Sequence, residues 1–107
     1  MLDFRDQADR KRLLALLARA DIVIESARPR ALEQMGIHAA QLRAARPGMV
    51  WLGITGYGRR APMRDWIAYG DDAGVAAGLA WLMGGDGDDP VFCADAIADP
   101  LAGLHAA

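Results

Sequence analysis

Asp99 directly precedes Pro100 near the end of the chain. Because proline is favoured at the first helical position, we expect a helix to begin here with Asp99 as its N-cap. In the structural interpretation, the Asp99 carboxylate satisfies free backbone N–H groups and contributes about 0.5–2 kcal/mol to stability. In the chemical interpretation, these donors keep the carboxylate ionised, oriented and available as a nucleophile. The local sequence leaves both interpretations open.

Two loops carry groups that could bind an anion. Residues 25–30 (ESARPR) place two arginines before a predicted helix, an arrangement suited to phosphate. The alternative is a pair of solvated arginines. Residues 55–60 (TGYGRR) contain two glycines that would let the backbone approach a ligand closely. The alternative there is an ordinary mobile loop, and in both loops the structural alternative is the commoner case.

Metal and thiol chemistry are disfavoured. The run 84–90 (GGDGDDP) resembles a calcium loop, but proline ends it and the glycine and glutamate of an EF-hand are not in place. His38 and His105 have no second histidine or cysteine at ligand spacing, so we predict no metal site. Cys93 lies in an apolar stretch without a nearby histidine, which favours a buried thiol over a nucleophile.

The elements that would position these groups follow from periodicity. We expect helices over 6–20, 31–35, 39–45, 71–83 and from 99 onward, and strands over 21–25, 49–54 and 91–94. The first two strands are unbroken apolar runs, typical of parallel strands covered on both faces. The segment between them is long enough for a right-handed helical crossover. The predicted fold class is α/β, a partial Rossmann-like parallel sheet with flanking helices.

Ligands of such sheets bind beyond the carboxyl ends of the strands, where both loops lie. Residues 1–4 read as the end of a strand, and the last helix has barely begun at Ala107. We therefore expect residues 1–107 to be part of a single domain rather than a complete one.

Composition excludes several classes of protein. With 53% apolar and 24% charged residues, the chain is typical of a globular protein. The net charge is −2 and the arginines are scattered, which argues against nucleic acid. No apolar run reaches the roughly 18 residues of a membrane helix, and we expect no membrane association. The charged N-terminus does not resemble a signal peptide, and a single cysteine suits the cytoplasm.

Several segments together resemble family III CoA-transferases of the CaiB/BaiF type, a group that includes formyl-CoA transferase, carnitine CoA-transferase and α-methylacyl-CoA racemase. The segments are 2–4 (LDF), 20–36 (ADIVIESARPRALEQMG), 54–58 (ITGYG), 69–84, which begins with a tyrosine and includes Gly78-Leu79, and 97–103 (IADPLAG). They keep the family's order and spacing over nearly the whole chain. The resemblance implies a fragment of the large domain of such an enzyme.

The resemblance also implies a chemistry. Asp99 would attack the thioester of an acyl-CoA and carry an aspartyl-CoA intermediate, from which CoA passes to a carboxylic acid. The positions implied to contact CoA or lead to the active site are Ser26, Ala27, Arg28, Ile67, Ala68, Tyr69 and Gly70. Acyl-CoA and a carboxylic acid would be the substrates, no cofactor would be tightly bound, and the full-length family forms homodimers.

The sequence departs from the family at several positions. Tyr69 stands where the racemase branch has a histidine, which favours transfer over racemisation. Gln34 and Ile67 replace an arginine and a lysine of some members, and Gly70 and Gly74 replace the usual Asp and Gln. Because family members are much longer, two alternatives stay open: an inactive truncated fragment, or an acyl-CoA racemase or dehydratase. The sequence names neither the acyl group nor the acceptor.

Overall fold

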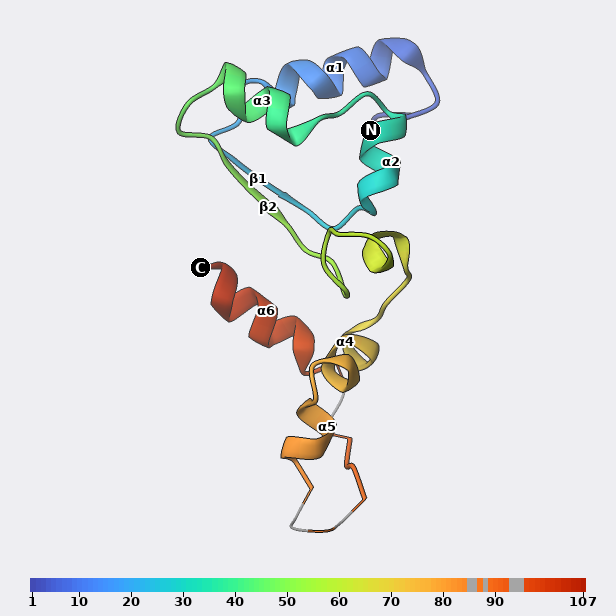
Figure 1. Cartoon of the computed structure of the whole chain (residues 1–107). Coiled ribbons are helices and arrows are strands. Elements are labelled where there is room, and N and C mark those ends of the chain that lie inside the picture. The colour runs from blue at the N-terminus through green and yellow to red at the C-terminus, as the bar shows by residue number, and fades with distance from the viewer. Residues whose placement is uncertain (85–86, 88, 93–95) are drawn as a thin grey trace. The chain divides into compact units, whose positions relative to one another are not determined.

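The computed structural model describes residues 1–84, 87, 89–92 and 96–107, which divide into two units, Met1–Ile54 and Thr55–Ala107 (Figure 1). The first unit contains α1 (Gln7–Leu17), β1 (Ile22–Glu25), α2 (Pro29–Gln34), α3 (Ala39–Ala45) and β2 (Val50–Gly53). The second contains a 3-10 turn, η1 (Met63–Asp65), and the helices α4 (Gly70–Ala76), α5 (Leu79–Leu82) and α6 (Ala98–Ala106).

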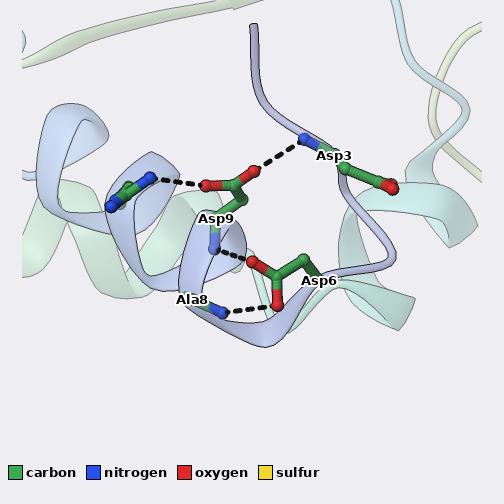
Figure 2. Close-up of polar contacts among 5 residues, drawn as sticks. Asp3, Asp6, Ala8 and Asp9 are labelled. Carbon is green, nitrogen blue, oxygen red and sulfur yellow. Dashed lines mark hydrogen bonds and ion pairs between the residues drawn. The ribbon is translucent and has the colours of Figure 1, made fainter.

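Helix α1 begins with side-chain capping (Figure 2). The Asp6 carboxylate accepts hydrogen bonds from the backbone N–H groups of Ala8 and Asp9, each at 3.3 Å. Asp9 in turn accepts one from the backbone N–H of Asp3 at 2.9 Å and pairs with Arg12 at 3.0 Å. The two bonds to Asp6 satisfy helix-start donors that have no partner within the helix. The helix predicted from residue 6 is confirmed, although it ends three residues before position 20.

The predicted parallel strand pair is confirmed. Strand β1 pairs with β2 in a parallel register that runs from Ile22 opposite Val50 to Glu25 opposite Gly53. Helices α2 and α3 form the crossover between them, as parallel strands require. In the part of the chain described, this sheet has two strands.

The covering of the sheet differs from expectation. Val23 is buried, at 7% exposure, but Ile22 and Ile24 are 63% and 66% exposed. Val50, opposite Ile22 in the register, is also exposed. Because successive side chains of a strand point to opposite faces, one face of the sheet is covered and the other presents three β-branched side chains. The apolar run predicted burial on both faces, and the first unit supplies cover for one.

The helix predicted over 71–83 is two helices, so that prediction is wrong in its continuity. Helix α4 ends at Ala76, and α5 begins at Leu79. Between them Gly78 adopts a left-handed conformation, with φ of +82°. This conformation terminates a helix, and glycine adopts it without the steric cost of a Cβ.

The short strand predicted over 91–94 is not formed at its first two residues. Val91 and Phe92 are irregular, and the Val91 N–H donates a hydrogen bond to the carbonyl of Ala80 at 3.0 Å. Residues 93 and 94, and with them the expected buried thiol of Cys93, lie outside the described residues. The same holds for positions 85, 86 and 88 of the acidic run.

The prediction that Asp99 is an N-cap is wrong by two positions. Helix α6 begins at Ala98, its N-cap is Ile97, and Asp99 is the second residue of its first turn. Pro100 is the third helical residue, where the missing N–H is tolerated because first-turn N–H groups have no partner within the helix. An Asp-Pro pair therefore predicts a helix start only to within a residue or two.

Candidate functional site

Asp99 and Gly70 lie against each other in the second unit. Asp99 is exposed on the first turn of α6, and Gly70 is the first residue of α4. A Cβ built on Gly70 would lie 3.0 Å from the Asp99 Oδ1 and 3.2 Å from the Cα and Cβ of Ala96. Two residues that the sequence singled out separately are thus brought together. The absence of a side chain at position 70 is therefore what allows the start of α4 to pack closely against the Asp99 carboxylate and Ala96.

Asp71 of α4 holds the backbone at Ala96, two residues before α6 begins. Its Oδ1 accepts a hydrogen bond from the backbone N–H of Ala96 at 3.1 Å. Ala96 has a φ of +50°, which costs an L-residue with a Cβ roughly 1–2 kcal/mol. The hydrogen bond offsets part of this cost and holds the turn that delivers Asp99. Asp71 is a positioning residue that the sequence analysis treated only as a helix start.

Tyr69 sits at the entrance of α4. It is the N-cap residue, and its N–H donates a hydrogen bond to the Asp72 Oδ2 at 2.9 Å. Its side chain is 77% exposed. Ile67 is likewise exposed, and Ala68 is half-buried. The segment 67–70 ends at Gly70, the residue that packs against Asp99, and its role at an active site stays a prediction.

The glycine-rich loop that follows β2 packs on this segment. A Cβ on Gly56 would overlap the Cβ of Ala68, so the glycine permits a close approach between two parts of the protein. Tyr57 contacts Trp66 edge to face, with ring centroids 5.6 Å apart. We expected the glycines to admit a ligand, and Gly56 has this structural role instead.

The second group of predicted residues lies in the first unit, at the carboxyl end of β1. Ser26 and Arg28 are exposed, and Ala27 is half-buried. Arg28 is the N-cap residue of α2, and the buried Pro29 is the first residue of that helix. Among the described residues, Arg28 makes no side-chain hydrogen bond or ion pair. This position is where ligands of parallel sheets bind.

Glu25 supports this loop and was not among the predicted site residues. Its Oε2 accepts a hydrogen bond from the backbone N–H of Ala27 at 2.8 Å, and its Oε1 accepts one from the Trp51 Nε1–H at 3.4 Å. The backbone carbonyl of Glu25 accepts from the N–H of Ile54 at 2.8 Å. Glu25 thereby connects the 26–28 loop to β2.

Within the ranges given above, no group of three or more His, Cys, Asp or Glu side chains is placed to hold a metal ion. None of the helices in that same part of the chain combines the length and the apolar character needed to cross a membrane.

Comparison with known proteins gives a consistent picture. The family model "CoA-transferase family III" matches residues 1–107. The alpha subunit of succinyl-CoA--L-malate CoA-transferase of Chloroflexus aurantiacus is 35% identical over 107 residues, which cover 99% of this chain and 25% of that protein. A subunit of succinyl-CoA:(R)-benzylsuccinate CoA-transferase of Thauera aromatica is 30% identical over 106 residues, covering 99% of this chain and 26% of that subunit.

The fold comparison agrees with these relatives. The crystal structure of a CaiB/BaiF family protein from Brucella suis superposes with a TM-score of 0.79 at 30% identity. The match covers 97% of this chain and 28% of that structure. The chain spans about a quarter of the length of the two curated relatives described above.

Proposed function

The chain belongs to CoA-transferase family III, and from this premise we propose that it is part of an enzyme that moves CoA from an acyl-CoA thioester to a carboxylic acid, with Asp99 as the nucleophile. The observation that carries the proposal is the exposed Asp99 carboxylate, which lies in the first turn of α6 and packs closely against Gly70, one of the residues expected to lead to the active site. The first turn of a helix also favours negative charge.

The proposed reaction has four steps. An Asp99 oxygen attacks the thioester carbonyl, which gives a mixed anhydride and releases CoA as the thiolate. The thiolate attacks the Asp99 acyl carbon, which gives an aspartyl-CoA thioester and releases the donor acid as its carboxylate. The acceptor carboxylate then attacks this thioester, and a second mixed anhydride forms as the thiolate leaves again. The thiolate finally attacks the acceptor acyl carbon, which yields the new acyl-CoA and restores the Asp99 carboxylate. Covalent catalysis of this kind divides one difficult exchange into easier steps.

The CoA moiety would be held by two sets of residues. Ser26, Ala27 and Arg28 stand at the carboxyl end of β1, where the exposed Arg28 guanidinium can form charge-assisted hydrogen bonds with phosphate. Ile67, Ala68, Tyr69 and Gly70 would line the path to Asp99. An exposed phenol at position 69 is less suited than an imidazole to move a proton at an α-carbon near neutral pH, which favours transfer over racemisation.

Further parts of the proposal concern the whole protein. Residues 1–107 would be part of its large domain, the complete chain would act as a homodimer in the cytoplasm, and no cofactor would be tightly bound. The relatives from Chloroflexus and Thauera are named as subunits of transferases. Their names support an assembled enzyme in general and leave the homodimer as part of this proposal.

The test uses the full-length transferase that contains this segment. Asp99→Asn keeps the size of the side chain and removes its nucleophilic oxygen. We expect CoA transfer to fall at least a thousandfold, and we expect intact-mass analysis after incubation with acyl-CoA to show an adduct in the wild type and none in the variant.

Asp9→Asn is the matched control, because Asp9 is also an acidic residue in the first turn of a helix. This control should keep its activity within about twofold, because Asp9 is not among the candidate site residues and its side chain contacts Asp3 and Arg12 instead. Equal activity in Asp99→Asn and the wild type would exclude Asp99 as the nucleophile.

A further inference from the structure

Two contacts join the loop that follows β2 to residues 66–70, the segment that leads into α4. A Cβ built on Gly56 would stand 2.1 Å from the Cβ of Ala68 and 3.4 Å from its Cα. The half-buried Tyr57 ring meets the Trp66 ring edge to face, with 78° between the ring planes. A ring pair of this kind stabilises a structure beyond the apolar area that it buries. Two consecutive residues of the loop therefore contact the segment at positions 66 and 68.

Gly56 is needed for this contact and not for its own backbone conformation. Gly58 has a φ of +81°, in the left-handed region, whereas Gly56 has no positive φ. Alanine could therefore adopt the Gly56 backbone conformation. Non-bonded carbon atoms prefer separations of about 3.5–4.0 Å, so a methyl group at position 56 and that of Ala68 must move apart by roughly 1.5 Å.

A shift of Ala68 would reach Asp99 through Gly70. Gly70 follows Ala68 by two residues, so their Cα atoms are at most about 7 Å apart. Gly70 packs so closely on its neighbours that a Cβ there would stand 3.0 Å from the Asp99 Oδ1 and 3.2 Å from the Cα of Ala96. The stretch 68–70 thus has a close contact at each end, and displacing one end presses on the other.

We propose that Gly56 and Tyr57 are positioning residues of the reaction at Asp99: they hold the segment 66–70 so that Gly70 and the Asp99 carboxylate keep their relative position. The proposal rests on the transferase function proposed above. It gives the glycine-rich loop a role in catalysis without a contact to the ligand. Changes in the loop should therefore act on kcat more than on CoA binding, for which Arg28 is the expected phosphate contact.

The first test adds a methyl group at position 56 of the full-length enzyme. Exchange is measured with succinyl-CoA and labelled succinate, acetyl-CoA and labelled acetate, and butyryl-CoA and labelled butyrate, and the fastest pair serves for the variants. Gly56→Ala should lower kcat roughly ten- to a hundredfold, because a displacement of about 1 Å near a reacting group costs up to about a hundredfold. The Kd for CoA, measured by calorimetry, should change by no more than about threefold.

The second test exchanges the methyl group between the two positions. In the double variant Gly56→Ala/Ala68→Gly, the new Cβ would meet the Cα of residue 68 at 3.4 Å, an ordinary van der Waals contact. Its kcat should return to within about threefold of that of Ala68→Gly alone, since residues in direct contact have non-additive effects. Gly103→Ala is the matched control for an added methyl group, because the space around Gly103 is open, and it should leave kcat unchanged.

Variants of Tyr57 give a measurement that does not depend on the folding of Gly56→Ala. Tyr57→Ala removes the ring contact with Trp66 and should lower kcat roughly three- to tenfold. Tyr57→Phe keeps the ring and should lose far less. Circular dichroism checks the folding of every variant, and if Gly56→Ala does not fold, the comparison of Tyr57→Ala with Tyr57→Phe decides.

The outcomes separate the two proposals. A folded Gly56→Ala enzyme with the wild-type kcat, a loss confined to CoA affinity, a double variant no more active than Gly56→Ala, or equal kcat values in the two Tyr57 variants would overturn the positioning role while the transferase function stands. Absence of exchange with every donor in the folded wild-type enzyme would overturn the transferase function and, with it, this inference.

Discussion

Gly70→Ala tests the contact on which the candidate site depends. The added Cβ would stand 3.0 Å from the Asp99 Oδ1 and 3.2 Å from the Cα of Ala96. Carbon atoms prefer separations of about 3.5–4.0 Å, so the neighbours must move by several tenths of an ångström. The carboxylate can rotate away, but Ala96 is backbone held by Asp71. Overpacking of this kind costs roughly 1–3 kcal/mol of folding free energy.

The shift should affect catalysis as well as stability. Because a displacement of about 1 Å at a reacting group can lower a rate on the order of a hundredfold, a shift of several tenths of an ångström should cost roughly tenfold. We therefore expect Gly70→Ala to lower the free energy of unfolding by about 1–2 kcal/mol, measured by urea denaturation, and to lower CoA exchange roughly tenfold.

Gly103→Ala is the control, because it places the same methyl group on a helix with nothing nearby. It should raise stability by about 0.5–1 kcal/mol, since alanine is the better helix former. If Gly70→Ala were stabilising to the same extent and fully active, the packing of Gly70 against Asp99 would be wrong.

Three further predictions concern positioning and binding. Arg28→Ala should weaken CoA binding roughly tenfold by calorimetry, whereas Arg43→Ala on α3 should not, because only Arg28 lies at the carboxyl end of β1; equal losses would remove Arg28 from the CoA site. Asp71→Ala should lower the free energy of unfolding by about 0.5–1.5 kcal/mol in urea and reduce exchange at unchanged CoA affinity, because it removes the hydrogen bond that holds the backbone at Ala96; a loss of CoA affinity alone would contradict this role. Gly78→Ala should lower the free energy of unfolding, measured by thermal denaturation, by about 1 kcal/mol, because alanine is disfavoured at a φ of +82°. An unchanged free energy of unfolding would argue against the left-handed conformation between α4 and α5.

The parts of the fold that were predicted correctly have local causes. Helix α1 follows from an apolar repeat with an aspartate at its start, and Asp6 indeed caps it. Strands β1 and β2 follow from apolar runs, and the length of the segment between them requires a crossover. In each case the residues that determine the structure are close together along the chain.

The features of the structure that were not predicted have two kinds of cause. Some depend on contacts between residues far apart in the sequence, and others on local patterns that are compatible with two structures. The contact of Gly70 with Asp99 and the hydrogen bond of Asp71 to Ala96 join α4 to the start of α6, and no local pattern announces them. The cap assigned to Asp99 was wrong because proline is tolerated throughout the first turn of a helix. The break at Gly78 was missed because a glycine within an apolar repeat can continue a helix or end it.

Through its contact with Glu25, Trp51 can report on the 26–28 loop by its fluorescence. One carboxylate contacts both the Ala27 backbone, at the centre of the candidate CoA loop, and the Trp51 indole on β2. Trp51 is half-buried, whereas Trp66 and Trp81 are exposed. A nucleotide that settles on the loop and shifts Glu25 therefore alters the polarity felt by Trp51, and its fluorescence would register occupancy without any added dye.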